Sequence, residues 1–245
     1  MRDAVALAGV TKLYGDVTAV KSVSINAREG EVYGLLGPSG SGKSTLLRLI
    51  DLLEPPDSGE VSIFGKAVDA ISRNAFQLRR QIGMVLQKPV VLNRSVENNL
   101  AYPLEIRGCG DEAVAKKVNQ ELKRLGLEDR RYKNARTLSG GEMQRLCFAR
   151  STIHDPDLLL LDEFAANLDP ANVALLEEMI KQYASKSGKK TVIVVTHNLF
   201  QAKRMCDRIA LMWEGEVVEV ADKRKFFENP DDPRTAAFVK GELVY

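Results

Sequence analysis

The sequence predicts an α/β fold with a parallel central sheet, an antiparallel β subdomain and an inserted helical subdomain. Three observations predict it. Short apolar runs at four places lack alternation, which is typical of strands covered on both faces of a sheet. The N-terminal stretch does alternate between apolar and polar residues, as half-buried strands do. A block of helical periodicity separates the second of the apolar runs from the third.

The N-terminal stretch predicts antiparallel β structure, because the polar turns "YGD" and "REGE" separate alternating segments that contain Val5 and Leu7, and then Val20, Val23 and Ile25. The first apolar run, "EVYGLLG" (31–37), ends in glycine. In the next segment, "KSTLLRLIDLL", apolar residues recur at helical spacing at Leu46, Leu47, Ile50 and Leu53. We therefore expect a strand, a glycine loop and a helix in succession.

The other apolar runs predict the remaining parallel strands: "IGMVLQ" (82–87), "DLLLLDEF" (157–164) and "TVIVVTH" (191–197). Between the first two of these, one helical stripe contains Ala113, Val114, Val118, Leu122 and Leu125. Further on, Glu214 and Gly215 separate two apolar runs, which predicts a hairpin. We expect a single domain over 1–245, with a core and β subdomain in 1–87 and 157–221, a helical subdomain in 88–156 and a C-terminal tail in 222–245.

Bulk properties exclude several classes of protein. A length of 245 residues with 44% hydrophobic residues suits a buried core. The net charge of +2 comes without any long block of like charges, so no nucleic-acid-binding surface is indicated. The 3 cysteines show no CxxC spacing, which favours a reducing compartment. No targeting segment or spanning helix is evident, so we expect a soluble chain that reaches a membrane only through a partner.

The first glycine loop is a phosphate-binding motif. Gly37, Gly42, Lys43 and Ser44 satisfy G-x-x-x-x-G-K-[ST], with a buried strand before the loop and an amphipathic helix after it. Backbone N–H groups and Lys43 would hold phosphates there, and Ser44 would ligate Mg²⁺. The alternative is a glycine-rich turn that binds nothing. The whole expected cradle is Gly37, Pro38, Ser39, Gly40, Ser41, Gly42, Lys43, Ser44 and Thr45.

Two carboxylates follow the buried run "LLLLD", where strand ends in open α/β sheets face the ligand crevice. We expect Asp162 to hold Mg²⁺ through its water shell and Glu163 to activate the attacking water as general base. The alternative is a solvated Asp-Glu pair in a loop. The upstream phosphate loop favours the catalytic interpretation.

A second glycine turn opens the helix "EMQRLCFARSTI". Ser139 and Glu142 have the spacing of a capping box, which by itself is a sufficient explanation for both residues. Gly140 and Gly141 would leave the first turn open to an anion. Because the first loop already wraps its own nucleotide, we expect this turn to serve a phosphate held by a second copy of the chain.

In this order, "GPSGSGKST", "LSGGE", "LLLLDE" and "VTH" resemble the motifs of the ATP-binding subunits of ABC transporters, and the resemblance runs from about residue 5 to the end. It implies a P-loop NTPase core that uses ATP and Mg²⁺. By this resemblance Tyr14 stacks on adenine, Gln87 touches the metal and the water, and His197 contacts the γ-phosphate. Alone, these three would be an ordinary tyrosine, a polar strand cap and a strand-end histidine.

The resemblance also implies residues that act in trans. Ser139, Gly140 and Gly141 would contact the γ-phosphate of ATP on the other subunit of a homodimer, and Asp169 would lie in the loop that crosses the interface. Phe164 and Ala165 depart from the family's usual proline and threonine after the catalytic glutamate. That departure concerns the fine geometry of the interfacial loop.

A single ATP-binding unit without a fused membrane span resembles importer subunits. It implies a permease partner, an extracytoplasmic solute-binding protein acting through the permease, and a peripheral position on the cytoplasmic face of the membrane. The stretch "KPVVLNRSVENNLAYPLEIRG" after Gln87 would form the permease groove, unless Val90, Val91 and Leu92 are helical core.

The cargo expectation depends on "QKP", "VTHN" and "FFENPDDPRTAAFVKGELVY", which resemble the ATPases of oxyanion importers, with tungstate or molybdate favoured over phosphate. Alternatives are import of phosphate or another small solute, a non-transport clamp on DNA or ribosomes, and a regulatory module without turnover. The clamp class usually carries fused pairs of domains, a coiled coil or a basic extension. Intact Glu163 and His197 argue against the last alternative.

Overall fold

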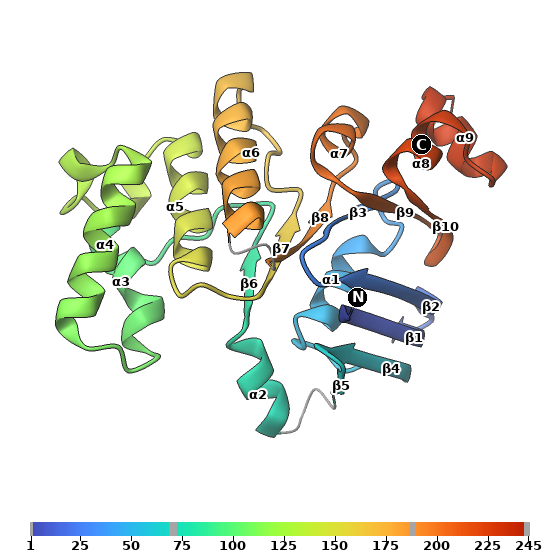
Figure 1. Ribbon diagram of the computed structural model, residues 1–245, viewed down its shortest axis with the longest axis horizontal. Coiled ribbons are helices and arrows are strands. Elements are labelled where there is room, and N and C mark those ends of the chain that lie inside the picture. The colour runs from blue at the N-terminus through green and yellow to red at the C-terminus, as the bar shows by residue number, and fades with distance from the viewer. Residues whose placement is uncertain (1, 69–72, 187–189, 243–245) are drawn as a thin grey trace.

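The computed structural model describes residues 2–68, 73–186 and 190–242, so the last three residues of "GELVY" lie outside the described part. Its central feature is a six-stranded sheet (Figure 1). The spatial order of its strands is β10 (Glu216–Asp222), β9 (Arg208–Trp213), β3 (Val32–Leu36), β8 (Thr191–Val195), β7 (Leu158–Asp162) and β6 (Ile82–Val85). All neighbours pair in parallel except β10 and β9. The predicted parallel sheet is confirmed.

The apolar runs are continuous because the two faces of this sheet belong to two different cores. In β7, Leu158 and Leu160 point into one core, while Leu159 and Leu161 point into the other. Successive side chains of a strand alternate between faces, so a strand buried on both sides needs an apolar residue at every position. One core lies under the N-terminal strands and the other under the helices.

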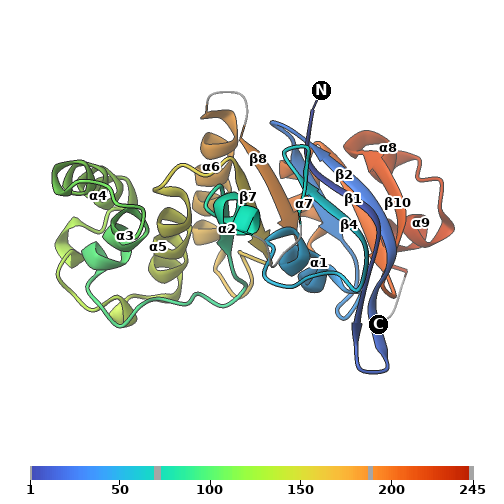
Figure 2. The ribbon, with the colours of Figure 1, turned by 90° about the horizontal axis from the view of Figure 1, so that it is seen from below.

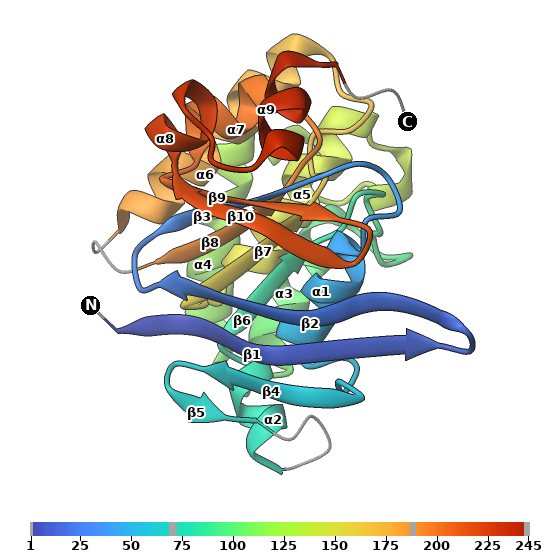
Figure 3. The same ribbon diagram turned by 90° about the vertical axis from the view of Figure 1, so that its right-hand side faces the viewer.

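The N-terminal strands form a separate antiparallel sheet in the order β2 (Val17–Arg28), β1 (Asp3–Tyr14), β4 (Ser58–Ile63) and β5 (Lys66–Ala67). Helix α1 (Lys43–Ile50) packs between this sheet and the central one (Figure 3). The β1–β2 prediction is confirmed, whereas β4 and β5 were not predicted. The expected apolar position at Leu53 is wrong, because α1 ends at Ile50 and Leu53 is 55% exposed.

A group of helices occupies the other end of the molecule: α3 (Val96–Glu105), α4 (Asp111–Leu125) and α5 (Gly140–Thr152), with short 3₁₀ turns at Glu128–Arg130 and Ala135–Thr137 (Figure 2). Of the predicted stripe on α4, Val114, Val118, Leu122 and Leu125 are buried. Ala113 is exposed, so its place in the stripe is wrong. Helix α2 (Arg73–Arg79) precedes β6.

Helices α6 (Pro170–Ser185) and α7 (Leu199–Met205) contribute to the same core as α5. The predicted hairpin is confirmed at Glu214 and Gly215, whose φ angles of 46° and 86° are those of a type I′ turn. The segment expected as a tail is helical: α8 (Lys223–Glu228) and α9 (Pro233–Lys240) pack beside β10. No helix in the described ranges is long and apolar enough to cross a membrane.

Candidate functional site

The predicted phosphate loop connects β3 to α1, and two of its glycines are required by close neighbours. At Gly42, where φ is 101°, a Cβ atom would lie 2.2 Å from the carbonyl oxygen of Ala19. At Gly37 a Cβ atom would lie 2.0 Å from the carbonyl oxygen of Met212. The loop is thus pressed between β2 and β9, and only glycine can keep its backbone open toward the cavity.

Lys43 lies beneath this loop with 5% of its surface exposed. Its Nζ atom donates hydrogen bonds to the carbonyl oxygens of Gly37 at 2.9 Å and Pro38 at 2.5 Å. Burial lowers the pKa of Lys43, while the carboxylates of Glu163 and Asp162 act in the opposite direction. A partly desolvated ammonium group that has only neutral oxygens as direct partners is well suited to attract a phosphate.

Asp162 stands at the end of β7 and faces the first turn of α1. The Ser44 hydroxyl donates to Asp162 Oδ1 at 3.2 Å. Burial raises the pKa of Asp162, and the hydrogen bond from Ser44 opposes this shift. The two residues predicted to serve a metal are therefore brought together.

Glu163 is the point where three strand ends meet. Gln87, after β6, donates from Nε2 to Glu163 Oε2 at 2.7 Å. His197, after β8, places Nδ1 at 3.2 Å from Glu163 Oε1. The backbone of Glu163 lies in the left-handed region at φ 42°, and its N–H donates to the carbonyl oxygen of Val195. Its carboxylate is thus held from both sides.

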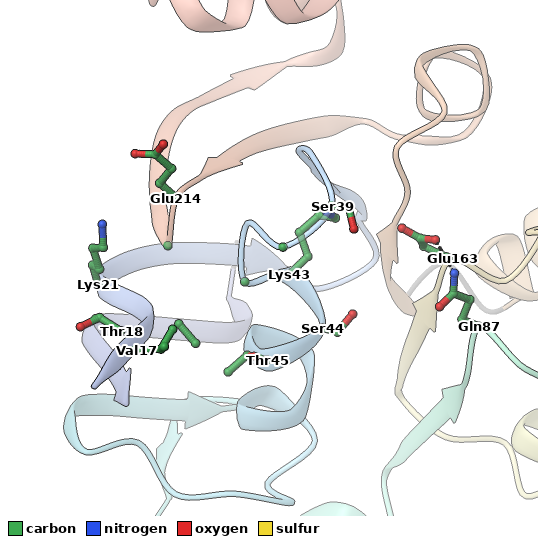
Figure 4. A pocket seen from close by; sticks show the side chains of 14 residues that line it. Val17, Thr18, Lys21, Ser39, Lys43, Ser44, Thr45, Gln87, Glu163 and Glu214 are labelled. Carbon is green, nitrogen blue, oxygen red and sulfur yellow. Dashed lines mark hydrogen bonds between the residues drawn. The ribbon is translucent and has the colours of Figure 1, made fainter. Parts of the chain in front are cut away.

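Of these residues, Lys43, Ser44, Gln87 and Glu163 border a cavity of about 570 Å³, whereas Asp162 and His197 do not line it (Figure 4). Its lining is Val17, Thr18, Ala19, Lys21, Ser39, Gly40, Gly42, Lys43, Ser44, Thr45, Gln87, Glu163, Glu214 and Gly215. Sequence reasoning missed the contributions of β2 and of the β9–β10 turn. Only the hairpin signal at Glu214 and Gly215 could have indicated one of them. Tyr14 does not border the cavity, and its hydroxyl donates to Glu54.

The second glycine turn lies apart from this cavity, since none of Ser139, Gly140 and Gly141 lines it. The predicted capping box is confirmed: Glu142 accepts from the N–H of Ser139 at 2.8 Å. The hydrogen bonds from Ser139 lower the pKa of Glu142. A side chain at Gly140 would meet nothing within 4 Å. The turn is therefore open to a ligand at Gly140.

Gly141 differs from its neighbour. A Cβ atom there would lie 2.4 Å from side-chain atoms of Asn172, so its side-chain position is covered, contrary to the expectation that both glycines are open. Asn172 also accepts a hydrogen bond from Arg145 and donates to Asp169 Oδ2 at 2.5 Å. Asp169 caps the N-terminus of α6 through the backbone N–H groups of Ala171 and Asn172. Asn172 thus connects the helix that begins with the second glycine turn to Asp169, the other residue expected to act in trans.

The fold and the cavity define a P-loop nucleotide-binding protein, because a glycine loop between the central strand β3 and helix α1 faces the two carboxylates at the end of β7 in the same sheet. The chain belongs to the ABC transporter family, whose model matches residues 20–166. It is similar to the phosphate import ATP-binding protein PstB 2 of Natronomonas pharaonis, with 39% identity over 98% of this chain and 87% of that protein.

Further relatives include the methionine import ATP-binding protein MetN of Geobacillus kaustophilus, 38% identical over 96% of this chain and 70% of that protein. A probable anion import ATP-binding protein of Haloferax volcanii is 35% identical over 95% of this chain and 85% of that protein. The chain is an importer-type ABC ATPase, and its reaction is ATP hydrolysis coupled to transport.

Solved structures agree with this assignment. Clostridium perfringens cbiO1, part of the ABC transporter complex cbiONQ, matches with a TM-score of 0.84 and 27% identity, over 99% of this chain and 97% of that chain. The ATP-binding cassette MJ0796, in a dimeric post-hydrolysis state bound to ADP and Pi, matches with a TM-score of 0.82 and 32% identity, over 90% of this chain and 99% of that chain.

Proposed function

We propose that the chain is the ATP-hydrolysing subunit of an ABC importer for an oxyanion, with tungstate or molybdate favoured, and that it works as a homodimer on the cytoplasmic face of the membrane. The observation that carries the catalytic part is the Glu163 carboxylate, held by Gln87 at 2.7 Å and by His197 at 3.2 Å beside the cavity that contains Lys43. This is the arrangement that a base acting on water at a terminal phosphate needs.

Positions around the cavity support the roles assigned to Lys43, Gln87 and Glu163, whereas those of Tyr14 and His197, which do not line it, come from the family resemblance. Lys43 and the loop N–H groups hold the phosphates, and Tyr14 on the neighbouring hairpin supports the adenine. Glu163 accepts the proton of the attacking water, a contribution typically worth ~10² to 10⁴ in rate. Gln87 orients that water, and His197, whose side chain is 65% exposed and contacts Glu163 through Nδ1, would contact the γ-phosphate.

The donor set suits Mg²⁺, which prefers oxygen ligands and keeps several of its waters. The Ser44 hydroxyl and the Gln87 amide oxygen would ligate it directly, and Asp162, 3.2 Å from Ser44, would hold it through water. When bound, the ion would neutralise charge on the outer phosphate oxygens. Burial disfavours the ionised form of Asp162, and a cation would reverse that effect.

Each site is completed in trans. Gly140 is open, Ser139 caps a helix N-terminus, and neither borders the chain's own cavity. A helix N-terminus with open N–H groups favours an anion. We therefore assign Ser139, Gly140, Gly141 and Asp169 to the nucleotide of a second copy, an assignment supported by the dimeric form of the similar cassette MJ0796.

A permease would couple hydrolysis to import, with an extracytoplasmic solute-binding protein acting through it. The segment after Gln87 supplies exposed apolar residues for docking, including Val90, which is 57% exposed, and Ile106, which is also 57% exposed. Val91 packs partly against the helical core instead. We also propose the division into a core with its β subdomain (1–87 and 157–221), a helical subdomain (88–156) and a C-terminal segment (222–245).

The oxyanion class of the cargo is supported by the phosphate-import relative and the probable anion-import relative, while the preference for tungstate or molybdate comes from the sequence resemblance alone. A second candidate, a methionine importer ATPase, is favoured by several relatives that are 35–39% identical. The cargo does not contact this chain in the proposed mechanism, so both candidates predict the same chemistry at Glu163.

Replacing the base tests the proposed function. Glu163→Gln keeps the size of the side chain and removes its charge, so we expect at least about 100-fold slower hydrolysis with ATP still bound. The variant should accumulate as an ATP-dependent dimer on gel filtration, whereas the wild type should not. Lys43→Ala is the matched control, because it should lose both hydrolysis and the dimer. A Glu163→Gln chain that hydrolyses ATP at the wild-type rate would remove Glu163 from this role.

A further inference from the structure

Helix α5 carries a buried glutamine, Gln144, two residues after the sequence "LSGGE". Gln144 is 2% exposed and lies in the second turn after the Ser139 cap. Its Nε2 atom donates to the carbonyl oxygen of Phe164 at 2.7 Å and to that of Leu86 at 3.3 Å. Both contacted atoms are carbonyl oxygens, so the nitrogen must face them, since only the nitrogen of an amide side chain donates.

The oxygen of the same amide group is left without a partner. Gln144 Oε1 is buried and has no hydrogen-bond partner among the described residues. An unsatisfied buried acceptor destabilises the folded state, because it has lost its hydrogen bonds to water. A side chain chosen only for packing would avoid that cost, since methionine has nearly the same length and no amide. The two donated bonds therefore have a purpose beyond filling space.

Those two hydrogen bonds complete a closed ring of contacts that includes the Glu163 carboxylate. Leu86 directly precedes Gln87, and Phe164 directly follows Glu163. Gln87 in turn donates to Glu163 at 2.7 Å. The ring therefore runs from the Gln144 amide through the end of β6 to Gln87, across to Glu163, and back through the Phe164 carbonyl.

We infer that Gln144 is a positioning residue for ATP hydrolysis, which fixes the strand ends that carry Gln87 and Glu163. Gln144 is 2% exposed and does not line the cavity, so it would act through Gln87 and Glu163 and not by contact with the nucleotide. Since α5 begins at Ser139 and Gly140, the ring also connects the turn assigned to the second copy's nucleotide with the chain's own base. The inference rests on the proposed function, in which Glu163 is the base.

The test uses the full chain with ATP and Mg²⁺. Gln144→Met removes both donors at nearly constant size, and Gln144→Glu turns a carboxylate toward two carbonyl oxygens. We expect kcat to fall about 10- to 100-fold, which is the loss that a misplaced catalytic group produces. The Kd for ATP, measured in the Glu163→Gln background, should stay within about twofold because the phosphate loop is untouched.

Ser151→Ala is the matched control. Ser151 is on the same helix and donates to the carbonyl oxygen of Met84 on β6 at 2.7 Å, outside the ring. Its loss should leave kcat within about twofold. A kcat within about twofold of wild type in both Gln144 variants would overturn the inference, and so would an equal loss in Ser151→Ala. If Gln144→Met does not fold, Gln144→Glu decides alone.

A double variant separates this inference from the proposed function. In single-turnover experiments, Gln144→Met should slow Glu163→Gln by less than about twofold, because the positioned base is already absent. A full additional loss would show that Gln144 acts elsewhere and would overturn the inference. Unchanged hydrolysis in Glu163→Gln alone would instead overturn the proposed function.

Discussion

At the scale of single residues, Glu163 is constrained in both its backbone and its side chain. A non-glycine residue at φ 42° costs about 1–3 kcal/mol, which the surrounding structure must offset. The N–H of Glu163 bonds to Val195, its carbonyl oxygen accepts from Ala166, and its carboxylate contacts Gln87 and His197. This strained backbone directs the side chain to the place where three strands end, in keeping with its proposed role as the base.

The two glycines of the second turn allow a matched test. Gly141→Ala would bring a methyl group to 2.4 Å from Asn172, so we expect a loss of about 1–3 kcal/mol in the free energy of unfolding. Gly140→Ala meets nothing within 4 Å, so we expect no loss and a gain of up to about 1 kcal/mol from helix propensity. Urea unfolding of the two variants measures the difference.

Asn172 provides the control for this pair. Asn172→Ala removes the atoms that collide with the new methyl group, so Gly141→Ala should cost less in that background than in the wild type. Equal stability of the two single alanine variants would contradict the close packing of Gly141 against α6.

At the scale of elements, the sequence predicts best where burial is uniform. Continuous apolar runs indicated the central strands because both faces are covered, and the hairpin at Glu214 required its own turn residues. The end of α1 was not predictable in the same way. Leu53 continues the helical spacing, but Leu52 adopts φ 57° and the N–H of Leu53 bonds back to the carbonyl oxygen of Arg48. This Schellman-type end turns Leu53 into solvent.

Features that depend on contacts between residues far apart in the sequence could not be predicted from the sequence. The helical nature of the C-terminal segment depends on packing against β10, and the roles of Gln144 and Asn172 depend on partners far away in the sequence. The candidate site residues were indicated by their motifs, yet nothing in the sequence said that Gln87 and His197 both contact Glu163. Spacing specifies a motif, and only the sheet order brings three strand ends together.

Asp51, at the C-terminal end of α1, should make the stability of the chain depend on pH. Burial raises the pKa of Asp51 from 3.8 to about 7, and the charge of Arg79 opposes the shift. The folded chain therefore holds a proton that the unfolded chain releases, and the free energy of unfolding falls as pH rises from about 4 to about 7. Asp51→Asn removes this dependence, so we expect a gain of roughly 1–3 kcal/mol at pH 8 and little change at pH 4.

Urea unfolding at several pH values measures the gain in Asp51→Asn relative to wild type, which cancels the other titrating groups. Asp16→Asn, which removes an exposed carboxylate in the β1–β2 turn, is the control for the loss of one negative charge. A gain that does not change between pH 4 and pH 8 would contradict a raised pKa at Asp51.

At the scale of the whole molecule, two cores share one sheet, and the site lies along the edge where the parallel strands end. The N-terminal sheet and α1 hold the phosphate loop from one side, while the helical core holds α5 and α6 from the other. Within one chain the second glycine turn does not border the cavity. The molecule therefore presents two half-sites, which we propose two copies of the chain join.

A photoreactive group on the γ-phosphate of ATP tests whether two copies of the chain contact the same nucleotide. A tagged chain with Lys43→Ala and Glu163→Gln should not bind nucleotide at its own phosphate loop. When this tagged chain is mixed with an untagged Glu163→Gln chain, any label on the tagged chain must come from nucleotide bound to its neighbour. We predict labelling of the tagged chain in the peptide that contains Ser139 and Gly140, with none when it is alone. Label confined to the untagged chain, at its own phosphate loop, would contradict the account.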